Sequence, residues 1–387
     1  MDLAELLAFV KQSGASDLYV SAGAQVMMRV HGDVVPLTVP DVPPTGVPKE
    51  LVQQTLYEVL TDSQKKKLEE HLELDCALSL HDVARFRVNV FFHERGMGAV
   101  FRIIPSSVPT FASLALPDVI ARFAERPHGL VLVTGPTGSG KSTTLAAMVD
   151  WINEREPGHI ITVEDPIEFV HRPKACMVHQ RELGANTRSF TAALRASLRE
   201  DPDVILVGEM RDLETIELAL TAAETGHLVL AHAAHRCPRA KTVDRIVSVF
   251  PADQQEQIRT QLAGSLEGIV AQVLLPRADK PGRVAAHEIC VATPAVKALI
   301  RDGKVHQIQT AIQTGTKLGM QTLSGTIARL AMEGKITKQV AEQAQLDYCG
   351  AIDLVAPAGA PPSTSYATAG AGGASAAPSV RKTAYGA

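Results

Sequence analysis

The most informative stretch of the sequence is Gly135-Pro-Thr-Gly-Ser-Gly-Lys-Ser142. It fits the pattern G-x-x-x-x-G-K-[ST], follows the apolar run 130–134 and precedes the helically patterned segment 143–153. In a strand–loop–helix unit the glycines let successive backbone N–H groups turn toward one centre, and the helix N-terminus adds positive potential there. The stretch therefore predicts a phosphate-binding loop made of Gly135, Pro136, Thr137, Gly138, Ser139, Gly140, Lys141, Ser142 and Thr143.

Such a loop implies ATP and Mg²⁺ as cofactors, because Lys141 is expected on the β- and γ-phosphates and the Ser142 hydroxyl on the metal. Two acids follow likely strands, where open α/β sheets place their ligand chemistry. Glu164 is the candidate for polarising the attacking water, although an acidic pair before proline is also typical of a plain turn. Glu209 ends an apolar strand and resembles a Walker B acid in the Mg²⁺ shell.

Short apolar runs alternate with helical patterns around this loop, which predicts an α/β fold with a mostly parallel sheet. The runs lie at 130–134, 160–163, 204–207 and 228–230, and from 253 to about 351 the patterning predicts helices. We expect an ATPase domain over 116–352, preceded by a linker at 105–115. Residues 353–387 are rich in Ala, Gly, Pro and Ser, so this tail is expected to be disordered.

Residues 1–104 have a different pattern, which predicts a small α+β domain. Apolar residues at 3, 6, 7 and 10 indicate a first helix, and 17–35 alternates with a hairpin signal at Gly32-Asp33. Residues 49–72 are helically patterned, and two strands are expected at 85–92 and 98–104.

Composition excludes several classes of protein. The 387 residues carry 38 Lys+Arg against 42 Asp+Glu, and only 4% are aromatic, which disfavours direct nucleic-acid binding. Five scattered cysteines without a Cys-x-x-Cys pair argue against a disulfide framework or a cysteine zinc site. The chain has neither a basic leader nor about 18 uninterrupted apolar residues, so we expect a cytoplasmic protein that meets a membrane only through partners.

Longer stretches resemble the secretion and pilus ATPases. Glu164-Asp-Pro-Ile-Glu-Phe169 resembles their Asp box, 197–212 their Walker B region, and 213–227 continues the match. Ala15-Ser-Asp-Leu-Tyr-Val-Ser-Ala-Gly23 and the strand Arg85-Phe-Arg-Val-Asn89 are similar to the PilT-type retraction ATPases of type IV pili. The resemblance covers residues 1 to about 350.

This resemblance implies a homohexamer in which each subunit pairs a PAS-like N-terminal domain with a RecA-like ATPase domain. It assigns Glu164 as general base and Glu209 as the Walker B acid. It also implies that Arg87 and Arg102 reach the nucleotide phosphates, whereas alone they would be solvated strand residues. The implied activity is ATP hydrolysis that powers pilus retraction and twitching motility. The implied partners are an inner-membrane pilus platform protein and other pilus motor ATPases, at the cytoplasmic side of the pilus base.

The family's His box is altered in this chain. His227 matches the first histidine, but the chain then reads His232-Ala-Ala-His-Arg-Cys-Pro-Arg239, and His235 takes the place of the second with one extra residue before it. A short compensated frameshift would produce this string from Thr-Leu-His-Thr, and a real lesion there predicts weakened hydrolysis.

Four alternatives stay open: an accessory retraction ATPase, an assembly or secretion ATPase, a catalytically weak scaffold hexamer, and a DNA translocase. Assembly and secretion ATPases usually carry a longer N-terminal extension and often a four-cysteine insertion, which this sequence lacks. The altered His box is the only support for a scaffold, and the charge balance disfavours a translocase.

Overall fold

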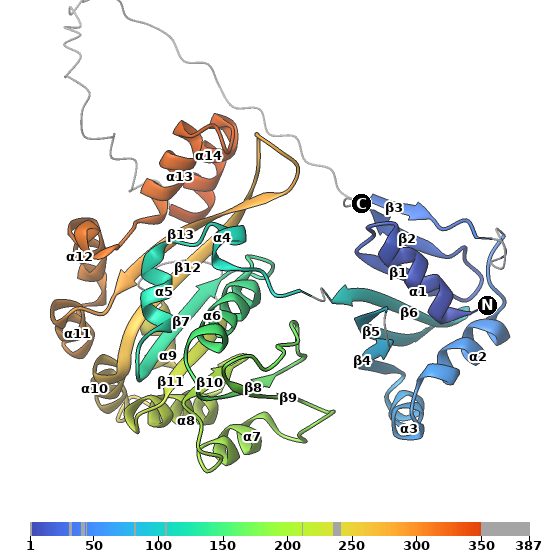
Figure 1. Ribbon diagram of the computed structural model, residues 1–387, viewed down its shortest axis with the longest axis horizontal. Coiled ribbons are helices and arrows are strands. Elements are labelled where there is room, and N and C mark those ends of the chain that lie inside the picture. Colours follow the sequence, from blue (N-terminus) through green and yellow to red (C-terminus); the bar gives the residue numbers. More distant parts are fainter. Residues whose placement is uncertain are drawn as a thin grey trace, which may run out of the picture.

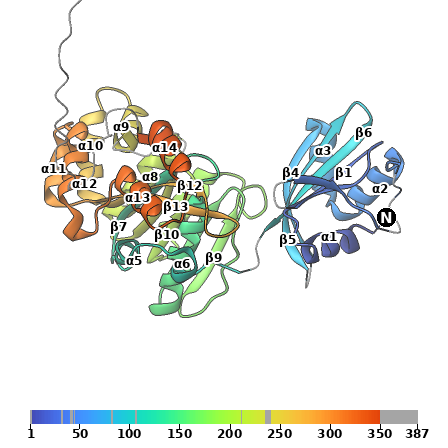
Figure 2. The same cartoon turned by 90° about the horizontal axis from the view of Figure 1, so that it is seen from above.

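The computed structural model describes residues 2–349, apart from 31–32, 40–42, 44, 81–82, 105–106, 211 and 235–240. The predicted hairpin residue Gly32, the predicted second histidine His235 and the predicted tail lie outside the described residues. The chain forms two units, each with its own sheet (Figure 1). We call residues 2–104 the N-terminal unit and residues 107–349 the C-terminal unit, and the two lie beside each other (Figure 2).

The N-terminal unit is a six-stranded antiparallel sheet with strand order β3-β2-β1-β6-β5-β4. Leu7, Leu56 and Leu68, one from each of its three helices, pack with Phe86 and Phe101 of the sheet in one apolar core. Its elements are α1 (Leu3–Gln12), β1 (Asp17–Ser21), β2 (Met27–Val30), β3 (Asp33–Pro36), α2 (Lys49–Val59), α3 (Asp62–His71), β4 (Glu73–Leu80), β5 (Ala84–His93) and β6 (Gly96–Ile104).

Two details of this unit differ from the sequence prediction. The helical segment expected at 49–72 is two helices, because Thr61 starts α3 with a capping box to Gln64. Strand β4 was not predicted, although apolar residues at 74, 76, 78 and 80 alternate with polar ones as in a half-buried strand.

The C-terminal unit is a seven-stranded sheet with order β13-β12-β7-β11-β10-β8-β9. Six of its strands are parallel, and β13 pairs antiparallel with β12. The predicted runs become four of these strands, and the predicted α/β class is confirmed. The strands are β7 (Gly129–Gly135), β8 (His159–Glu164), β9 (Met177–Glu182), β10 (Val204–Val207), β11 (Leu228–Ala234), β12 (Leu266–Pro276) and β13 (Arg283–Val291).

The prediction of helices throughout 253–351 is wrong where β12 and β13 form. Strand β12 is buried on both sides along most of its length. A strand covered on both faces has no polar alternation, so hydrophobic periodicity does not distinguish it from a buried helix.

Helices cover both faces of the C-terminal sheet. On β7, Leu130 and Leu132 pack with α8, α10, α11 and α12, whereas Val131 and Val133 pack with α5 and α6 on the opposite face. The helices are α4 (Phe111–Leu114), α5 (Asp118–Ala124), α6 (Lys141–Arg155), α7 (Phe190–Ser197), α8 (Leu213–Glu224), α9 (Lys241–Ser248), α10 (Gln255–Ser265), α11 (Pro294–Arg301), η1 (Val305–Gln307), α12 (Ile308–Thr314), η2 (Thr316–Leu318), α13 (Leu323–Met332), α14 (Lys338–Ala344) and η3 (Gln345–Cys349).

None of the helices in these described ranges is long and apolar enough to cross a lipid bilayer. Helix α4 falls inside the segment expected as a linker, and its Phe111 ring packs at a tilt against Trp151 of α6 with ring centroids 4.6 Å apart.

Candidate functional site

The predicted phosphate loop connects the central strand β7 to helix α6. Gly135, the last residue of β7, has φ of 146°, and a Cβ there would lie 2.2 Å from the Gln272 carbonyl oxygen. Gly140 has φ of 86° and stands directly before α6. Both positions favour glycine because an L side chain rarely adopts this backbone conformation. The nine predicted residues thus run from the last residue of β7 through the turn 136–140 into the first three residues of α6.

The loop presents polar groups that suit a phosphate. Gly140 provides no side-chain cap for the fifteen-residue α6, so the first backbone N–H groups of the helix are available to an anion. The hydroxyl oxygens of Ser139 and Thr134 are buried without a hydrogen-bond partner among the described residues. Buried hydroxyls of this kind are costly unless a ligand or water pairs with them. The loop therefore fits a nucleotide polyphosphate.

Lys141 is the first residue of α6, and its buried side chain folds back against the loop. Its Nζ donates to the carbonyl oxygens of Gly135 at 3.1 Å and Pro136 at 3.0 Å. Burial lowers the pKa of Lys141, while the nearby carboxylates of Glu209 and Glu168 raise it. The ammonium group is thus held at the phosphate loop, next to an acidic cluster.

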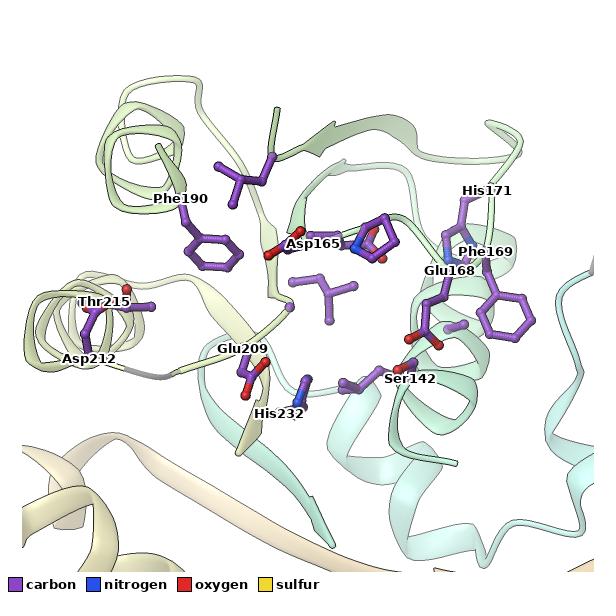
Figure 3. Close-up of a pocket in the computed structure, with 17 residues that line it drawn as sticks. Ser142, Asp165, Glu168, Phe169, His171, Phe190, Glu209, Asp212, Thr215 and His232 are labelled. Carbon is purple, nitrogen blue, oxygen red and sulfur yellow. The ribbon is translucent and has the colours of Figure 1, made fainter. Parts of the chain in front are cut away.

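A cavity opens beside the loop at the carboxyl ends of the strands. Its lining includes Ser142 of α6, Glu164 of β8 and His232 of β11. Glu168 and Glu209, which lie in loops after β8 and β10, also line it. Figure 3 shows Ser142, Glu168, Glu209 and His232 around the same side of this cavity. The structure therefore brings together Ser142, Glu164 and Glu209, which lie far apart in the sequence.

Glu164 is the last residue of β8 and is buried. Its Oε1 accepts hydrogen bonds from Thr162 Oγ1 at 2.7 Å and from Gln180 Nε2 at 3.1 Å. Burial raises the pKa of Glu164 to about 7, while these two hydrogen bonds act in the opposite direction. A carboxyl with a pKa near neutrality is suited to accept a proton at physiological pH.

Glu209 follows β10 across Gly208, which lies tightly against β8. The Gly208 N–H donates to the Val163 carbonyl oxygen at 2.8 Å, and a Cβ on Gly208 would come within 3.0 Å of the Glu164 Cα. Glycine here lets the ends of the two acid-bearing strands approach. Among the described residues no three His, Cys, Asp or Glu side chains form a metal-binding group. One hydroxyl and one carboxylate suit Mg²⁺, which takes its remaining ligands from phosphate and water.

The predicted His227 lies away from the cavity, and His235 is outside the described residues. His227 precedes β11 at the amino edge of the sheet, and its carbonyl accepts from the N–H of Gly129 at the start of β7. Its Nδ1 lies 2.9 Å from the Ala222 carbonyl oxygen, so it does not line the cavity at the opposite edge. His232, which was not predicted, does line the cavity. The sequence signal that could have identified His232 is its place just beyond the apolar run 228–230, near the carboxyl end of the expected strand.

Neither predicted arginine lines the cavity. Arg87 and Arg102 lie directly opposite each other on β5 and β6, and Arg87 is exposed. Arg102 Nε donates to Asp17 Oδ1 at 2.7 Å. Arg85, two residues from Arg87 on the same face of β5, does reach the C-terminal unit through an ion pair with Glu182 of β9. Sequence reasoning missed Arg85 because strand position alone does not reveal a partner in another unit.

This fold and this loop define a P-loop ATPase with a RecA-like domain behind a smaller N-terminal domain. Residues 2–298 match the family described as Type II/IV secretion system protein, and the chain belongs to that family.

Two curated relatives cover nearly the same span. The chain is 52% identical over 343 residues to the type IV pilus retraction ATPase PilT of Pseudomonas aeruginosa, covering 89% of this chain and 98% of that protein. It is 40% identical to the type IV pilus ATPase PilU of the same organism, covering 87% of each. A crystal structure of the pilus retraction motor PilT with bound ADP matches with a TM-score of 0.83 at 43% identity, over 89% of this chain and 97% of that one.

Proposed function

We propose that this chain is an ATP-hydrolysing motor that retracts type IV pili and so drives twitching motility. One observation carries the proposal: a complete phosphate loop faces two acids in a chain that is 52% identical to PilT over 98% of that protein's length. The PilT structure that contains ADP supports a nucleotide as ligand of this loop.

The residues of the phosphate loop and the cavity have separate roles in the proposed hydrolysis. Lys141 and the N–H groups at the start of α6 bind the phosphates. Ser142 and Glu209 would hold Mg²⁺, partly through water, and bound Mg²⁺ would supply neutralisation of charge on the phosphate oxygens. Glu164 takes a proton as the water oxygen bonds to the γ-phosphorus and the bond to the ADP oxygen breaks. Its raised pKa allows this transfer near neutral pH.

Arg87 and Arg102 are proposed to reach the phosphates after a movement of the N-terminal unit. Their face of the sheet supports this, because Arg85 on the same face of β5 contacts β9. Arg102 must exchange Asp17 for the nucleotide when it does so. His232 is the histidine that we place beside the phosphates, since it lines the cavity. The roles of His227 and His235 stay predictions.

The working assembly is proposed to be a homohexamer at the cytoplasmic side of the pilus base, peripheral to the inner membrane. It would act with the inner-membrane platform protein and the other pilus motor ATPases. We propose an N-terminal domain over 1–104, an ATPase domain over 116–352 and a tail over 353–387. Helix α4 packs on the ATPase domain through Phe111.

The extent of the similarities favours a retraction ATPase over a secretion ATPase. The match to the type II secretion system protein E of Aeromonas hydrophila is 49% identical but covers only 23% of that protein. The similarity to PilU extends over 87% of both chains, so the accessory retraction role is the second candidate.

Phosphate release by the purified chain, with Lys141→Ala as its control, tests the enzyme. A rate of phosphate release equal to that of Lys141→Ala would favour a scaffold hexamer over a motor. Resequencing of the gene at 232–236 tests the frameshift. A deletion strain tests the biology: loss of a retraction motor leaves long pili and no twitching, whereas loss of an assembly ATPase leaves no pili.

A further inference from the structure

The side chain of Gln180 connects the strand β9 to the Glu164 carboxylate. We propose that Gln180 is a positioning residue that fixes the orientation of the Glu164 carboxylate for catalysis. This inference rests on the proposed function of Glu164 as general base. It gives a part in the reaction to strand β9, which lies outside the sequence motifs of the family.

Three hydrogen bonds hold the amide of Gln180 in place. Its Nε2 donates to Glu164 Oε1 at 3.1 Å and to the Phe169 carbonyl oxygen at 2.9 Å. Its Oε1 accepts from the His171 N–H at 2.7 Å. Two acceptors lie beside the nitrogen and one donor beside the oxygen, so only one of the two amide orientations satisfies all three partners. The side chain therefore presents an N–H to Glu164 in a fixed direction.

The strand pairing holds this contact in place. In the parallel ladder between β8 and β9, Thr162 pairs with Gln180 and Glu164 pairs with Glu182. Thr162 Oγ1 donates to the same Glu164 Oε1 at 2.7 Å, so two neighbouring donors converge on one carboxylate oxygen. Side chains two residues apart on a strand share a face, which explains why Thr162 and Glu164 meet here.

This arrangement offsets the cost of burying a carboxylate. Burial favours the protonated acid, while the donors of Thr162 and Gln180 favour the charged form. Removal of the Gln180 donor is therefore expected to make Glu164 harder to ionise. Activity that requires ionised Glu164 would then be lost at a higher pH than in the parent.

Gln180 also holds the loop after Glu164, so a purely structural role has to be separated from a positioning role. Glu182 provides the control, because its Oε2 accepts from the Ile167 N–H of the same loop at 3.0 Å and pairs with Arg85, while its side chain gives no hydrogen bond to the Glu164 carboxylate in the described part of the chain. Loosening the loop at Ile167 disturbs the segment but leaves both donors on Glu164. Glu182→Gln also breaks the ion pair with Arg85, but it removes no hydrogen-bond donor from the Glu164 carboxylate, whereas Gln180→Met does.

The experiment measures kcat and KM for ATP against pH for the full chain, for Gln180→Met and for Glu182→Gln. Methionine has a similar length without donors. We expect the acid limb of the kcat profile to move up by about 1 pH unit in Gln180→Met, with KM within about twofold of the parent. In Glu182→Gln the acid limb stays in place. A uniform fall of kcat at every pH in Gln180→Met, or a change in KM alone, would overturn the proposal.

Gln180→Glu keeps the volume and serves if the methionine variant does not fold. A second carboxylate beside Glu164 disfavours its charged form, so the acid limb moves in the same direction, and an unmoved limb overturns the proposal. Glu164→Gln tests the base separately. Full activity of Glu164→Gln refutes the role of Glu164 as general base. If Glu164→Gln is inactive but the acid limb is unmoved in both Gln180 variants, only the role of Gln180 is refuted.

Discussion

Arg85 of β5 and Glu182 of β9 form an ion pair that joins the two units of the chain. The carboxylate is almost fully buried and the guanidinium mostly so. The same Glu182 oxygen accepts from the Ile167 N–H, three residues beyond Glu164. One carboxylate oxygen thus contacts both the N-terminal unit and the loop that follows the proposed base.

Arg85→Ala is expected to lower the free energy of unfolding by about 1–3 kcal/mol, because it leaves a buried carboxylate without its charged partner. Urea denaturation measures the loss. The exchanged pair Arg85→Glu with Glu182→Arg restores the attraction between the units but not the acceptor for Ile167. If the single and double variants add to within about 0.5 kcal/mol, the two residues are not coupled.

Lys141→Ala should abolish nucleotide binding while the chain stays folded. Lys141 lies in the phosphate loop and its ammonium is desolvated, so its removal costs the unfolding free energy little. Phosphate release is expected to fall by about 10²-fold or more. Binding of a fluorescent ATP analogue checks the cause, with the exposed Lys304→Ala as control. An unchanged affinity in Lys141→Ala would contradict the assignment of the loop.

Glu164→Gln should remove activity and stabilise the protein above neutral pH. The pKa of Glu164 is about 7 in the folded chain and near 4.5 when unfolded, so the native state binds the extra proton between these values. Stability therefore falls as pH rises through this window, by on the order of 3 kcal/mol when complete. Thermal unfolding at pH 5 and pH 8 tests this. The gain in unfolding free energy from Glu164→Gln should be clear at pH 8 and small at pH 5. An equal gain at both pH values would contradict the raised pKa of Glu164.

Gln272→Leu should loosen the phosphate loop. The buried Gln272 of β12 accepts from Thr144 Oγ1 at 2.9 Å and donates to the Ser139 carbonyl oxygen at 2.6 Å. Leucine leaves both groups unpaired, at a cost of about 1–3 kcal/mol of unfolding free energy. We expect KM for ATP to rise more than kcat falls. Adding Thr144→Val removes one unpaired group and should recover part of the stability, but not the KM.

Acid should destabilise the chain through His287. Burial lowers the pKa of His287 to about 4, and its Nε2 has no hydrogen-bond partner in the described part of the chain. The unfolded histidine has a pKa near 6.5, so stability is complete above that pH and is lost as pH falls toward 4. The difference in unfolding free energy between pH 7 and pH 5 should shrink in His287→Leu. An unchanged difference would assign the acid sensitivity elsewhere.

The sequence alone was sufficient where the chemistry is local. The phosphate-loop motif is eight consecutive residues whose glycines and lysine act through the backbone around them, so Gly135 to Ser142 could be predicted without a structure. Four strands of the C-terminal sheet were equally visible, because each is a short apolar run between helical patterns. Strand β12 was not, because its burial on both faces removed the alternation.

Which residues meet at the site depends on the three-dimensional packing of distant segments. The parallel order of β11, β10 and β8 brings Ser142, Glu164, Glu209 and His232 to one cavity and leaves His227 at the other edge of the sheet. Gln180 and Arg85 acquire their partners through strand pairing and through contact between the two units. The physical reason is that a side chain's partners depend on register and packing between distant segments, which the amino-acid order at any one place does not contain.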